Sequence, residues 1–582
     1  MKALPIKLFL IFFCVFLFSF GAGRLSLEYK GDENFYFRSA EDMLERGDLI
    51  TPQYLGKNRF EKPILFYWLV AASFKILGVG WFSARFVSAA MGALTVFLVF
   101  LITDSFRGDR LTAVFASVFL ATTPLFYRYS RLALPEVTMV FFMTLSLYLF
   151  ARFYRTGEGG LYILLSISLA LAFLTKGFSG VLIPVFIIAI FTFVKKRQIL
   201  SARQWLVGLV FFSILVSPWF YLMYRLHGSD YISHVWTREI LQRLGAGGSG
   251  SYALSLITNA YYYTAGLITR FFPYSLFLPA AVLKSGLSIR SGRNQKELED
   301  LHLISLIWIG VAFIFFTLVG EARIHYLLAL APPVAIITAS LFSNVAKGRV
   351  SEYTSLFRIP YVITLAGISV FAVLFSLSEY ISGTGVPPAW KIIFIVVPLT
   401  MFAGYNKRKS LLTALVVPAT LSFFYIMTVF AQPLGLFTNK MECAARAIKT
   451  EYRHGDAIIV GSHGIIPEEL QVYFEVPILV TKARYAKNGE PDEGSRRALN
   501  AALSPEGRKF CVIKRKDYEA VMPLDIKERF RIIKSYYVWK RRITLDDIKA
   551  RLGRANRKGP LRDIVQNEIY VITNSEEGGR IL

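Results

Sequence analysis

Residues 81–103 read WFSARFVSAAMGALTVFLVFLIT, and Arg85 is the single charged side chain in this run. A helix needs about 20 mainly apolar residues to cross the hydrocarbon core of a bilayer, because each residue adds about 1.5 Å of length. Residues 135–151 and 411–430 form further apolar runs close to that length. The chain is therefore predicted to be a membrane protein with many spans, which excludes a soluble enzyme of several domains.

The overall composition agrees with these runs. The 582 residues are 54% hydrophobic and 18% charged, and the mean hydropathy is +0.47. Soluble domains carry about 25% charged residues. The three cysteines form no CxxC pair, so the sequence predicts neither a zinc site nor a disulfide framework. Cys443 and Cys511 both lie near the C-terminus, and a disulfide between them in an oxidising compartment stays open.

The apolar runs predict a polytopic α-helical fold with about 13 transmembrane helices. Lys2 and Lys7 lie at the start of the first run, which places the N-terminus in the cytoplasm by the positive-inside rule. A cleaved signal peptide at 1–22 is the alternative, and it would leave the later topology unchanged. The predicted spans are roughly 5–22, 81–103, 111–127, 135–153, 161–175, 178–194, 204–224, 260–283, 301–319, 324–342, 360–378, 390–404 and 409–431.

Every predicted cytoplasmic loop is basic, as the positive-inside rule requires. An odd number of spans then places the residues after 432 outside the cytoplasm. We divide the chain into a membrane domain, residues 1–435, and a small α/β domain, residues 436–582. Residues 24–80, named the first outer segment, are also predicted outside. The basic loop residues are Arg107, Arg110, Arg152, Arg155, Lys195, Lys196, Arg197, Arg203, Lys284, Arg290, Arg293, Lys296, Lys347, Arg349, Arg358, Lys407, Arg408 and Lys409.

The C-terminal part alternates short apolar runs with helical patterns, which predicts the α/β domain. Residues 438–582 hold 28 Lys and Arg against 20 Asp and Glu, which favours an anionic surface as partner. Residues 461–464, Gly-Ser-His-Gly, follow a predicted strand, and a plain turn is favoured there over an anion-binding loop. The expected strands are 456–461, 471–480, 509–514, 529–539 and 567–573, and the expected helices are 441–452, 495–503 and 545–552.

The first outer segment begins with a predicted helix over 32–47. Asp32 is a suitable N-cap, and Gly47 is a suitable residue to end the helix. A purely capping role is therefore one interpretation of Asp32. Asp32 and Glu33 also follow the end of the first span closely, where an anionic pair would meet membrane-bound substrates. That position favours a functional interpretation.

A second helix is predicted over 63–78, with Pro63 in its first turn. At about 22 Å it is too short to span the membrane, so it should lie in the interface with Tyr67 and Trp68 as anchors. Arg59 and Lys62 precede it directly. Cations beside a helix N-terminus favour anion binding, and at this depth the anion would be a lipid phosphate. Simple contact with lipid headgroups is the alternative.

Several later residues are predicted to face the same side of the membrane. Taken singly, such residues are usually snorkelling or capping groups. As a set, they bring acids, cations and a tyrosine to one leaflet above apolar helices. They are Glu136, Lys176, Arg270 and the stretch Arg323-Ile324-His325-Tyr326.

These motifs together resemble the GT-C superfamily of membrane glycosyltransferases, in the branch of lipid A aminoarabinose transferases and protein O-mannosyltransferases. The resemblance covers about the first 340 residues. It rests on Asp32-Glu33, Gly47-Asp48-Leu49-Ile50-Thr51-Pro52, Arg59-Phe60-Glu61-Lys62-Pro63, Tyr67-Trp68-Leu69, Ser130-Arg131, Ala133-Leu134-Pro135-Glu136, Thr175-Lys176-Gly177 and His325-Tyr326-Leu327.

The resemblance implies a GT-C fold in the bacterial inner membrane, with the active site and the C-terminal domain in the periplasm. It implies transfer of a sugar from a polyprenyl-phosphate carrier to lipid A, another envelope glycan or a protein hydroxyl, with no nucleic acid involved. Asp32, with Glu33 beside it, would be catalytic. Lys62, Arg59 and Arg270 would bind the carrier phosphate, and Glu61, Glu136, Lys176 and Tyr326 would line the polar pocket.

A divalent metal is the one cofactor that the resemblance raises. Glu61 is retained as a ligand, but the stretch that holds the family's histidine reads Glu239-Ile240-Leu241-Gln242-Arg243 here. Ile240 therefore stands in place of that histidine. His227 or His234 is an alternative ligand, and metal binding at Glu61 stays open.

Displacing a phosphate from an anomeric carbon requires a base for the acceptor proton and a cation for the leaving oxyanion. Asp32 and Lys62 are our candidates, and a single displacement would invert the sugar. A transporter or flippase is the alternative function, but it would place ionisable groups near the midplane between repeated halves. The sequence shows no internal repeat. A non-enzymatic assembly protein that binds through its tail is the third reading.

The predicted topology can be tested with single cysteines introduced near positions 32 and 62, in a variant that lacks the three native cysteines. We expect a membrane-impermeant thiol reagent to label both positions from outside the cytoplasm. Labelling that requires permeabilised membranes would contradict the topology, and the proposed active site with it.

Overall fold

The computed structural model describes residues 4–23, 31–106, 110–196, 199–235, 252–291, 296–318, 322–348 and 357–364 of the N-terminal part. It also describes 441–481 and 492–539, with gaps of one or two residues, and 566–574. Two compact units form, mainly residues 35–373 and mainly residues 428–582. The predicted spans 390–404 and 409–431, most of 360–378 and the predicted helix 545–552 lie outside the described residues.

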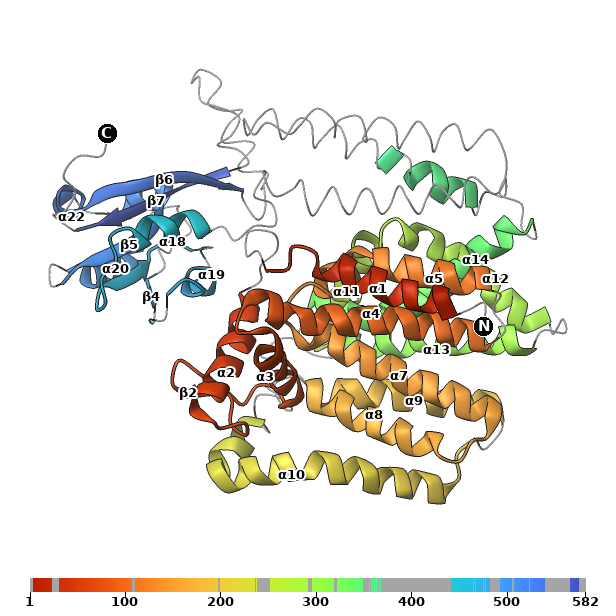
Figure 1. Ribbon diagram of the computed structural model, residues 1–582. Coiled ribbons are helices and arrows are strands. Elements are labelled where there is room, and N and C mark those ends of the chain that lie inside the picture. The colour runs from red at the N-terminus through yellow and green to blue at the C-terminus, as the bar shows by residue number, and fades with distance from the viewer. Residues whose placement is uncertain are drawn as a thin grey trace. The chain divides into compact units, whose positions relative to one another are not determined.

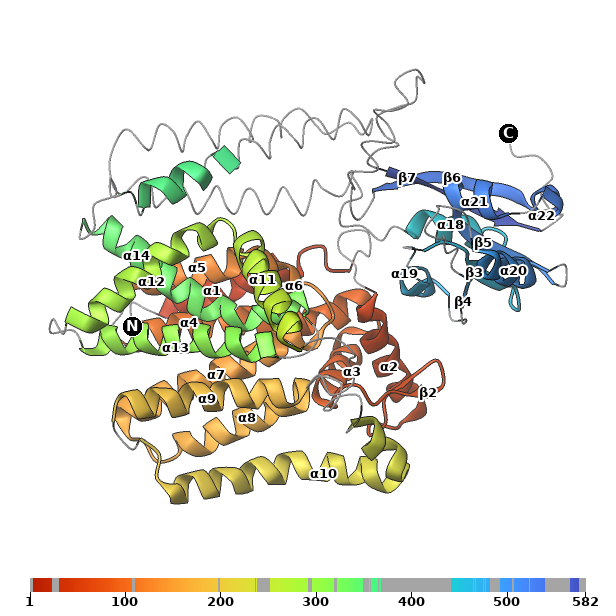
Figure 2. The same ribbon diagram turned by 180° about the vertical axis from the view of Figure 1, so that it is seen from behind.

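The first unit is a bundle of apolar helices (Figures 1 and 2). Helices α1 and α4 lie on the face seen in Figure 1, α11, α12 and α14 lie on the opposite face, and α10 runs along one edge beside α8. The helices are α1 (Leu4–Ser19), α4 (Trp81–Ser105), α5 (Arg110–Thr122), α6 (Pro124–Tyr129), α7 (Pro135–Thr156), α8 (Leu161–Lys176), α9 (Phe178–Val194), α10 (Ala202–His234), α11 (Tyr252–Arg270), α12 (Tyr274–Ser291), α13 (Lys296–Leu318) and α14 (Ala331–Ala346), the last preceded by the 3-10 helix η2 (Ile324–Leu330).

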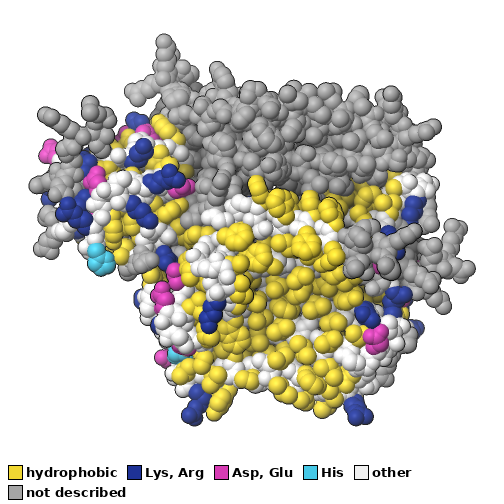
Figure 3. Space-filling model, viewed as in Figure 1, with side chains coloured by type: hydrophobic (Ala, Val, Ile, Leu, Met, Phe, Trp, Pro, Cys, Tyr) yellow, Lys and Arg dark blue, Asp and Glu magenta, His cyan; other side chains and the backbone are white. Residues whose placement is uncertain are grey.

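Within the described residues, five helical segments are long and apolar enough to cross a membrane, or six if the bent pair α11–α12 counts as one. Shorter apolar helices, among them α1, α5, α8 and α9, pack beside them. The face drawn in Figure 3 is mostly apolar, and charged side chains gather toward its ends. Such a surface suits a hydrocarbon environment between two polar boundaries.

Two predicted spans are broken in the structure. Residues 111–127 form α5 and α6, because Thr123 is extended and Pro124 lacks the backbone N–H that a continuous helix requires. Residues 260–283, which were predicted as one continuous span, form two helices, α11 and α12, that meet at 109°. Asn259 and Tyr263 on α11 hydrogen-bond the backbone of Thr317 and Arg323. Helix α11 therefore lies along the end of α13, and α12 follows in another direction.

The C-terminal end of α1 is capped by two buried arginines from other elements. Arg85 Nη1 on α4 donates to the Ala22 carbonyl at 3.0 Å. Arg131 Nη1, in the α6–α7 loop, lies 3.2 Å from the Leu17 carbonyl oxygen and 3.3 Å from that of Phe18. Cations stabilise the last turn of a helix and satisfy its free carbonyl groups. The place where the first outer segment begins is therefore fixed by charge as well as by packing.

The first outer segment contains α2 (Asp32–Arg46), a two-stranded hairpin and α3 (Leu65–Leu77). The hairpin pairs β1 (Gln53–Tyr54) with β2 (Lys57–Asn58). The predicted helix 32–47 is confirmed, and Gly47 ends it with φ +70°. Helix α3 begins two residues after Pro63 and ends before Gly78, at φ +82°. Its Tyr67 is fully buried, so the prediction of Tyr67 as an interface anchor is wrong, whereas Trp68 is exposed.

The second unit is a five-stranded sheet in the order β4-β3-β5-β7-β6, with helices on both faces. Strand β3 pairs in parallel with β4 and β5, and β7 is antiparallel to β5 and β6. Its elements are α18 (Glu442–Lys449), β3 (Ala457–Val460), α19 (Pro467–Gln471), β4 (Leu479–Val480), α20 (Glu493–Ala502), β5 (Lys509–Lys514), α21 (Arg515–Val521), α22 (Leu524–Arg529), β6 (Arg531–Trp539) and β7 (Gln566–Thr573).

Most predicted strands of this unit are confirmed within two residues. Residues 471–480 are the exception, because only Leu479–Val480 is a strand and residues 467–471 form α19. No disulfide joins Cys443 to Cys511. Cys443 is exposed on α18, which covers one face of the sheet, and Cys511 is buried on the other face, in the same apolar cluster as Leu499.

The cap of α1 gives a stability prediction. Arg85→Met leaves the Ala22 carbonyl without this donor, so we expect the free energy of unfolding to fall by about 1.5–3 kcal/mol. Unfolding in mixed micelles measures it. Arg152→Met is the control, because the exposed Arg152–Glu158 pair should contribute about 0–1 kcal/mol. Equal effects of the two substitutions would contradict a stabilising cap.

Candidate functional site

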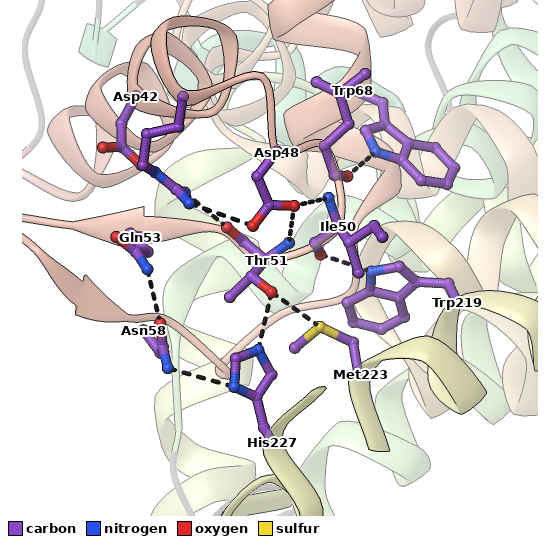
Figure 4. Close-up of polar contacts among 12 residues, drawn as sticks. Asp42, Asp48, Ile50, Thr51, Gln53, Asn58, Trp68, Trp219, Met223 and His227 are labelled. Carbon is purple, nitrogen blue, oxygen red and sulfur yellow. Dashed lines mark hydrogen bonds and ion pairs between the residues drawn. The ribbon is translucent and has the colours of Figure 1, made fainter. Parts of the chain in front are cut away.

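The loop that follows α2 is folded around one carboxylate (Figure 4). Asp48 Oδ1 accepts the backbone N–H of Ile50 at 2.8 Å and of Thr51 at 3.3 Å. Arg46 contacts Asp48 Oδ2 at 3.2 Å and donates to the Thr51 carbonyl at 3.0 Å. These hydrogen bonds explain the Gly47–Pro52 motif as a turn that closes on itself. The motif therefore shapes the first outer segment.

Helix α10 holds this loop from the opposite side (Figure 4). Trp219 Nε1 donates to the Ile50 carbonyl at 3.0 Å. One turn further on, Met223 Sδ lies 3.9 Å from Thr51 Oγ1. After one more turn, His227 Nε2 lies 2.8 Å from the same hydroxyl. Side chains spaced four apart on a helix share one face, so a single stripe of α10 binds the loop.

Arg59 lies in an aromatic cage formed by residues of the first outer segment. Its Nε donates to the Tyr67 hydroxyl at 3.0 Å, and its guanidinium carbon lies 4.2 Å from the centre of the Phe35 ring. Glu61 Oε2 lies 3.7 Å from Arg59 Nη1. Burial raises the pKa of Tyr67, although Arg59 opposes the rise, so the phenol stays neutral and accepts the hydrogen bond. The cage fixes the guanidinium beside Glu61.

Lys62 and the two acids of the first helix occupy defined positions. Lys62 Nζ donates to the Glu61 carbonyl at 2.8 Å. Asp32 and Glu33 form the first turn of α2, and Glu33 is buried. Between the two cations, the Phe60 ring packs against α10. Arg59, Glu61 and Lys62 thus lie in one stretch of chain, and Phe60 packs this stretch against α10.

A second cluster of buried polar groups lies inside the bundle. Glu136 Oε1, at the start of α7, accepts from Lys176 Nζ at 3.0 Å and lies 3.6 Å from His325 Nε2. Lys176 Nζ also lies 5.4 Å from the centre of the Tyr326 ring. Breaking a buried ion pair costs about 3–5 kcal/mol, because it leaves one charge uncompensated. A charged cluster of this kind is retained where it serves a site or fixes a packing arrangement.

The structure brings together some of the predicted site residues. Glu136, Lys176 and Tyr326 meet in the bundle, and Arg59, Glu61 and Lys62 adjoin in the first outer segment. Arg270 is exposed at the end of α11, and no described contact joins it to either set. Sequence reasoning missed the roles of His325 and Trp219. His325 belongs to the motif His325-Tyr326-Leu327, which could have indicated its role. No pattern in the sequence indicates that Trp219 contacts Ile50.

Among the residues that the structure describes, those around Glu61 do not form a defined metal centre. Glu61 Oε2 and His234 Nε2 are buried and have no hydrogen-bond partner among the described residues. His227 is engaged at both ring nitrogens. In the part of the chain that the structure describes, no three His, Cys, Asp or Glu residues are grouped to hold an ion. One carboxylate and one imidazole fall short of the usual ligand set, so we route no chemical step through a metal.

Known proteins resemble this chain at the level of sequence. The profile of the family described as dolichyl-phosphate-mannose-protein mannosyltransferase matches residues 6–232. An uncharacterized protein of Aquifex aeolicus is 31% identical over 57% of this chain and 72% of its own length. The undecaprenyl phosphate-alpha-4-amino-4-deoxy-L-arabinose arabinosyl transferase of Pectobacterium atrosepticum is 28% identical over 54% of this chain. The match spans 55% of that transferase, about half of its length.

The fold resembles that of a solved transferase. The crystal structure of ArnT from Cupriavidus metallidurans bound to undecaprenyl phosphate matches 98% of this chain and 99% of its own, with a TM-score of 0.65 and 17% identity. The predicted fold class, a helical membrane protein with a small C-terminal α/β domain, is confirmed. The named relatives are transferases, which does not favour the transporter alternative.

The turn at Asp48 gives a pH prediction. Burial alone would raise the pKa of Asp48, but hydrogen bonds from Ile50 and Thr51 and the charge of Arg46 lower it overall. A lowered pKa in the folded state adds stability above the unfolded-state pKa of about 3.9, and this stability is lost as the pH falls through the folded-state value.

We therefore expect Asp48→Asn to lower the midpoint of thermal unfolding at pH 7, and the difference from the unmodified chain to shrink as the pH falls below 4. Unfolding followed across pH measures this difference. Asp230→Asn, at an exposed position of α10, is the control and should show no such dependence. A constant difference at all pH values would contradict the assignment.

Proposed function

The chain belongs to the GT-C superfamily of membrane glycosyltransferases, in the branch of aminoarabinose transferases and protein O-mannosyltransferases, and from this premise we propose that it transfers a sugar from a polyprenyl-phosphate carrier to an acceptor outside the cytoplasm. The observation that carries the proposal is the stretch Arg59–Lys62. Two cations lie there beside an apolar helix, and one of them is fixed in an aromatic cage. A phosphate on an isoprenoid tail needs cations to bind the phosphate and an apolar surface to bind the tail.

The donor is proposed to be an undecaprenyl-phosphate sugar. A relative carries this carrier in its name, and the crystallised ArnT binds undecaprenyl phosphate. The outward side of α3 is apolar at Trp68, Ala72 and Ile76, spaced four apart as one helix face requires. This stripe would lie against the lipid tail while Arg59 and Lys62 contact the phosphate. Lys62 supplies a compact charge and Arg59 a planar fork.

The chemical step is proposed as a single displacement at the anomeric carbon. Asp32 takes the proton of the acceptor hydroxyl as its oxygen forms the new bond to the sugar. The bond from the anomeric carbon to the phosphate oxygen breaks, and its electron pair stays with the phosphate. Lys62 and Arg59 stabilise the negative charge that develops there. With no second carboxylate acting as nucleophile, the sugar is inverted.

The acceptor is proposed to lie on the periplasmic side, as lipid A, another envelope glycan or a protein hydroxyl. The excess of Lys and Arg in residues 438–582 supports an anionic acceptor surface over a neutral one. Glu136, Lys176 and Tyr326 would supply polar contacts to the sugar or the acceptor. Arg270, exposed at the end of α11, is proposed as a further cation for the carrier phosphate.

The proposed roles can be tested by complementation of a strain that lacks this protein, with mass spectrometry of its envelope lipids and glycans. The sugar missing from that strain identifies the product. We expect Asp32→Asn to reduce its formation by about 10²–10⁴-fold, as the loss of a general base does. We expect Lys62→Met to reduce it by about 10²–10³-fold.

Glu45→Gln is the matched control, because Glu45 is an exposed carboxylate on the same helix as Asp32. It should restore the product fully. Wild-type product levels with Asp32→Asn, at equal amounts of folded protein, would remove Asp32 from the mechanism. An unchanged envelope in the deletion strain would contradict the proposed transfer itself.

A further inference from the structure

The hairpin of the first outer segment is closed at its base by one imidazole (Figure 4). His227 Nε2 lies 2.8 Å from Thr51 Oγ1, and His227 Nδ1 lies 3.4 Å from Asn58 Nδ2. Thr51 precedes the first strand and Asn58 ends the second. The two sides of the hairpin are therefore tied to a single side chain of α10, about 170 residues away in sequence.

The amide orientations of this structure correspond to one tautomer of this imidazole. Gln53 Nε2 donates to Asn58 Oδ1 at 3.0 Å, so the Asn58 amide nitrogen is the group that faces His227. In this orientation the amide nitrogen is the donor, and His227 Nδ1 accepts from it. The ring proton then lies on Nε2 and is donated to Thr51 Oγ1. The chain of donors runs in one direction, from Gln53 through Asn58 and His227 to Thr51.

The same residue adjoins the proposed phosphate site. Asn58 is followed directly by Arg59, whose backbone N–H donates to the Pro52 carbonyl at 2.8 Å. The next residue, Phe60, packs its ring 5.1 Å from the His227 ring. Any shift of His227 would therefore move the backbone from which the Arg59 and Lys62 side chains extend.

Helix α10 is shaped so that it contacts this stretch on both sides of a break. Gly228 interrupts the helix with φ +55° and ψ −133°, a conformation that favours glycine. Beyond the break, the Tyr231 and His234 rings lie 5.4 Å and 5.7 Å from the Phe60 ring. Phe60 is thus enclosed by His227 before the break and by two rings after it.

We propose that His227 is a positioning residue for carrier binding, which sets the place of Arg59 and Lys62 through its hydrogen bonds to Thr51 and Asn58. The inference rests on the proposed function, because the anion in question is the carrier phosphate. It adds a residue of α10 that acts through Thr51 and Asn58. The hydrogen bonds carry the role, and the ring's packing against Phe60 does not.

The test separates hydrogen bonding from packing. His227→Phe keeps a ring against Phe60 and removes both hydrogen bonds, whereas His227→Gln keeps an amide donor and an acceptor. Tyr231→Phe is the matched control, because it removes a polar atom from a ring that packs on the same Phe60. For each full-length protein in nanodiscs, the Kd for undecaprenyl phosphate and the midpoint of thermal unfolding are measured.

We expect His227→Phe to raise the Kd at least tenfold, His227→Gln to raise it less, and Tyr231→Phe to leave it unchanged, with similar unfolding midpoints. A general structural role would lower the midpoint and leave the Kd of the folded fraction unchanged, which would overturn the inference. Should His227→Phe not fold, Thr51→Val takes its place, because it removes the hydroxyl that His227 Nε2 contacts; an unchanged Kd for this variant would overturn the inference, and a raised one would support it. If the unmodified protein does not bind undecaprenyl phosphate, the proposed function fails as well, and this outcome is distinct from equal binding by all variants.

Discussion

The backbone between Gly47 and Ile64 is largely irregular, and its polar groups must be satisfied at a place predicted to border hydrocarbon. An unpaired peptide group there costs several kcal/mol. Asp48, Arg46 and Trp219 supply partners for Ile50 and Thr51, and the Leu49 carbonyl accepts from Trp68 Nε1 at 2.7 Å. Arg46 comes from α2, Trp68 from α3 and Trp219 from α10, whereas Asp48 lies in the loop itself. The positions of Arg59 and Lys62 depend on these hydrogen bonds, because their side chains extend from the same stretch of backbone.

Buried charged side chains inside the bundle also fix the position of the first outer segment. Arg85 and Arg131 end α1 where the first outer segment begins. Five residues after Arg131, Glu136 opens α7 and pairs with Lys176. Each of these charges would be costly to bury alone in an apolar environment. Each has a partner on another element, and the pair holds the two elements together. Arg131, which stabilises the end of α1, and Glu136, which is proposed to contact the sugar or the acceptor, therefore lie close together in the sequence.

The sequence was sufficient where local chemistry decides the structure. Apolar length predicted the bundle, Gly47 predicted the end of α2, and alternating runs predicted most strands of the C-terminal unit. It failed where distant residues decide. Tyr67 was expected at the interface because tyrosine is common there, but Arg59 and the Tyr36 ring contact it, and it is buried in protein. The bend between α11 and α12 was not predicted, although Pro273 lies at the bend and lacks the backbone N–H that a continuous helix requires. The attachment of α10 to the first outer segment joins residues about 170 positions apart, and no local pattern reports that.

The central claim is that the cations of the first outer segment bind the carrier phosphate. A cryo-electron microscopy structure of the full-length protein in nanodiscs with undecaprenyl phosphate tests it most directly. The account predicts a phosphate oxygen within about 3.2 Å of Lys62 Nζ or of the Arg59 guanidinium, with the isoprenoid tail along the apolar side of α3. A phosphate bound elsewhere, with Arg59 and Lys62 in contact only with protein, would contradict it.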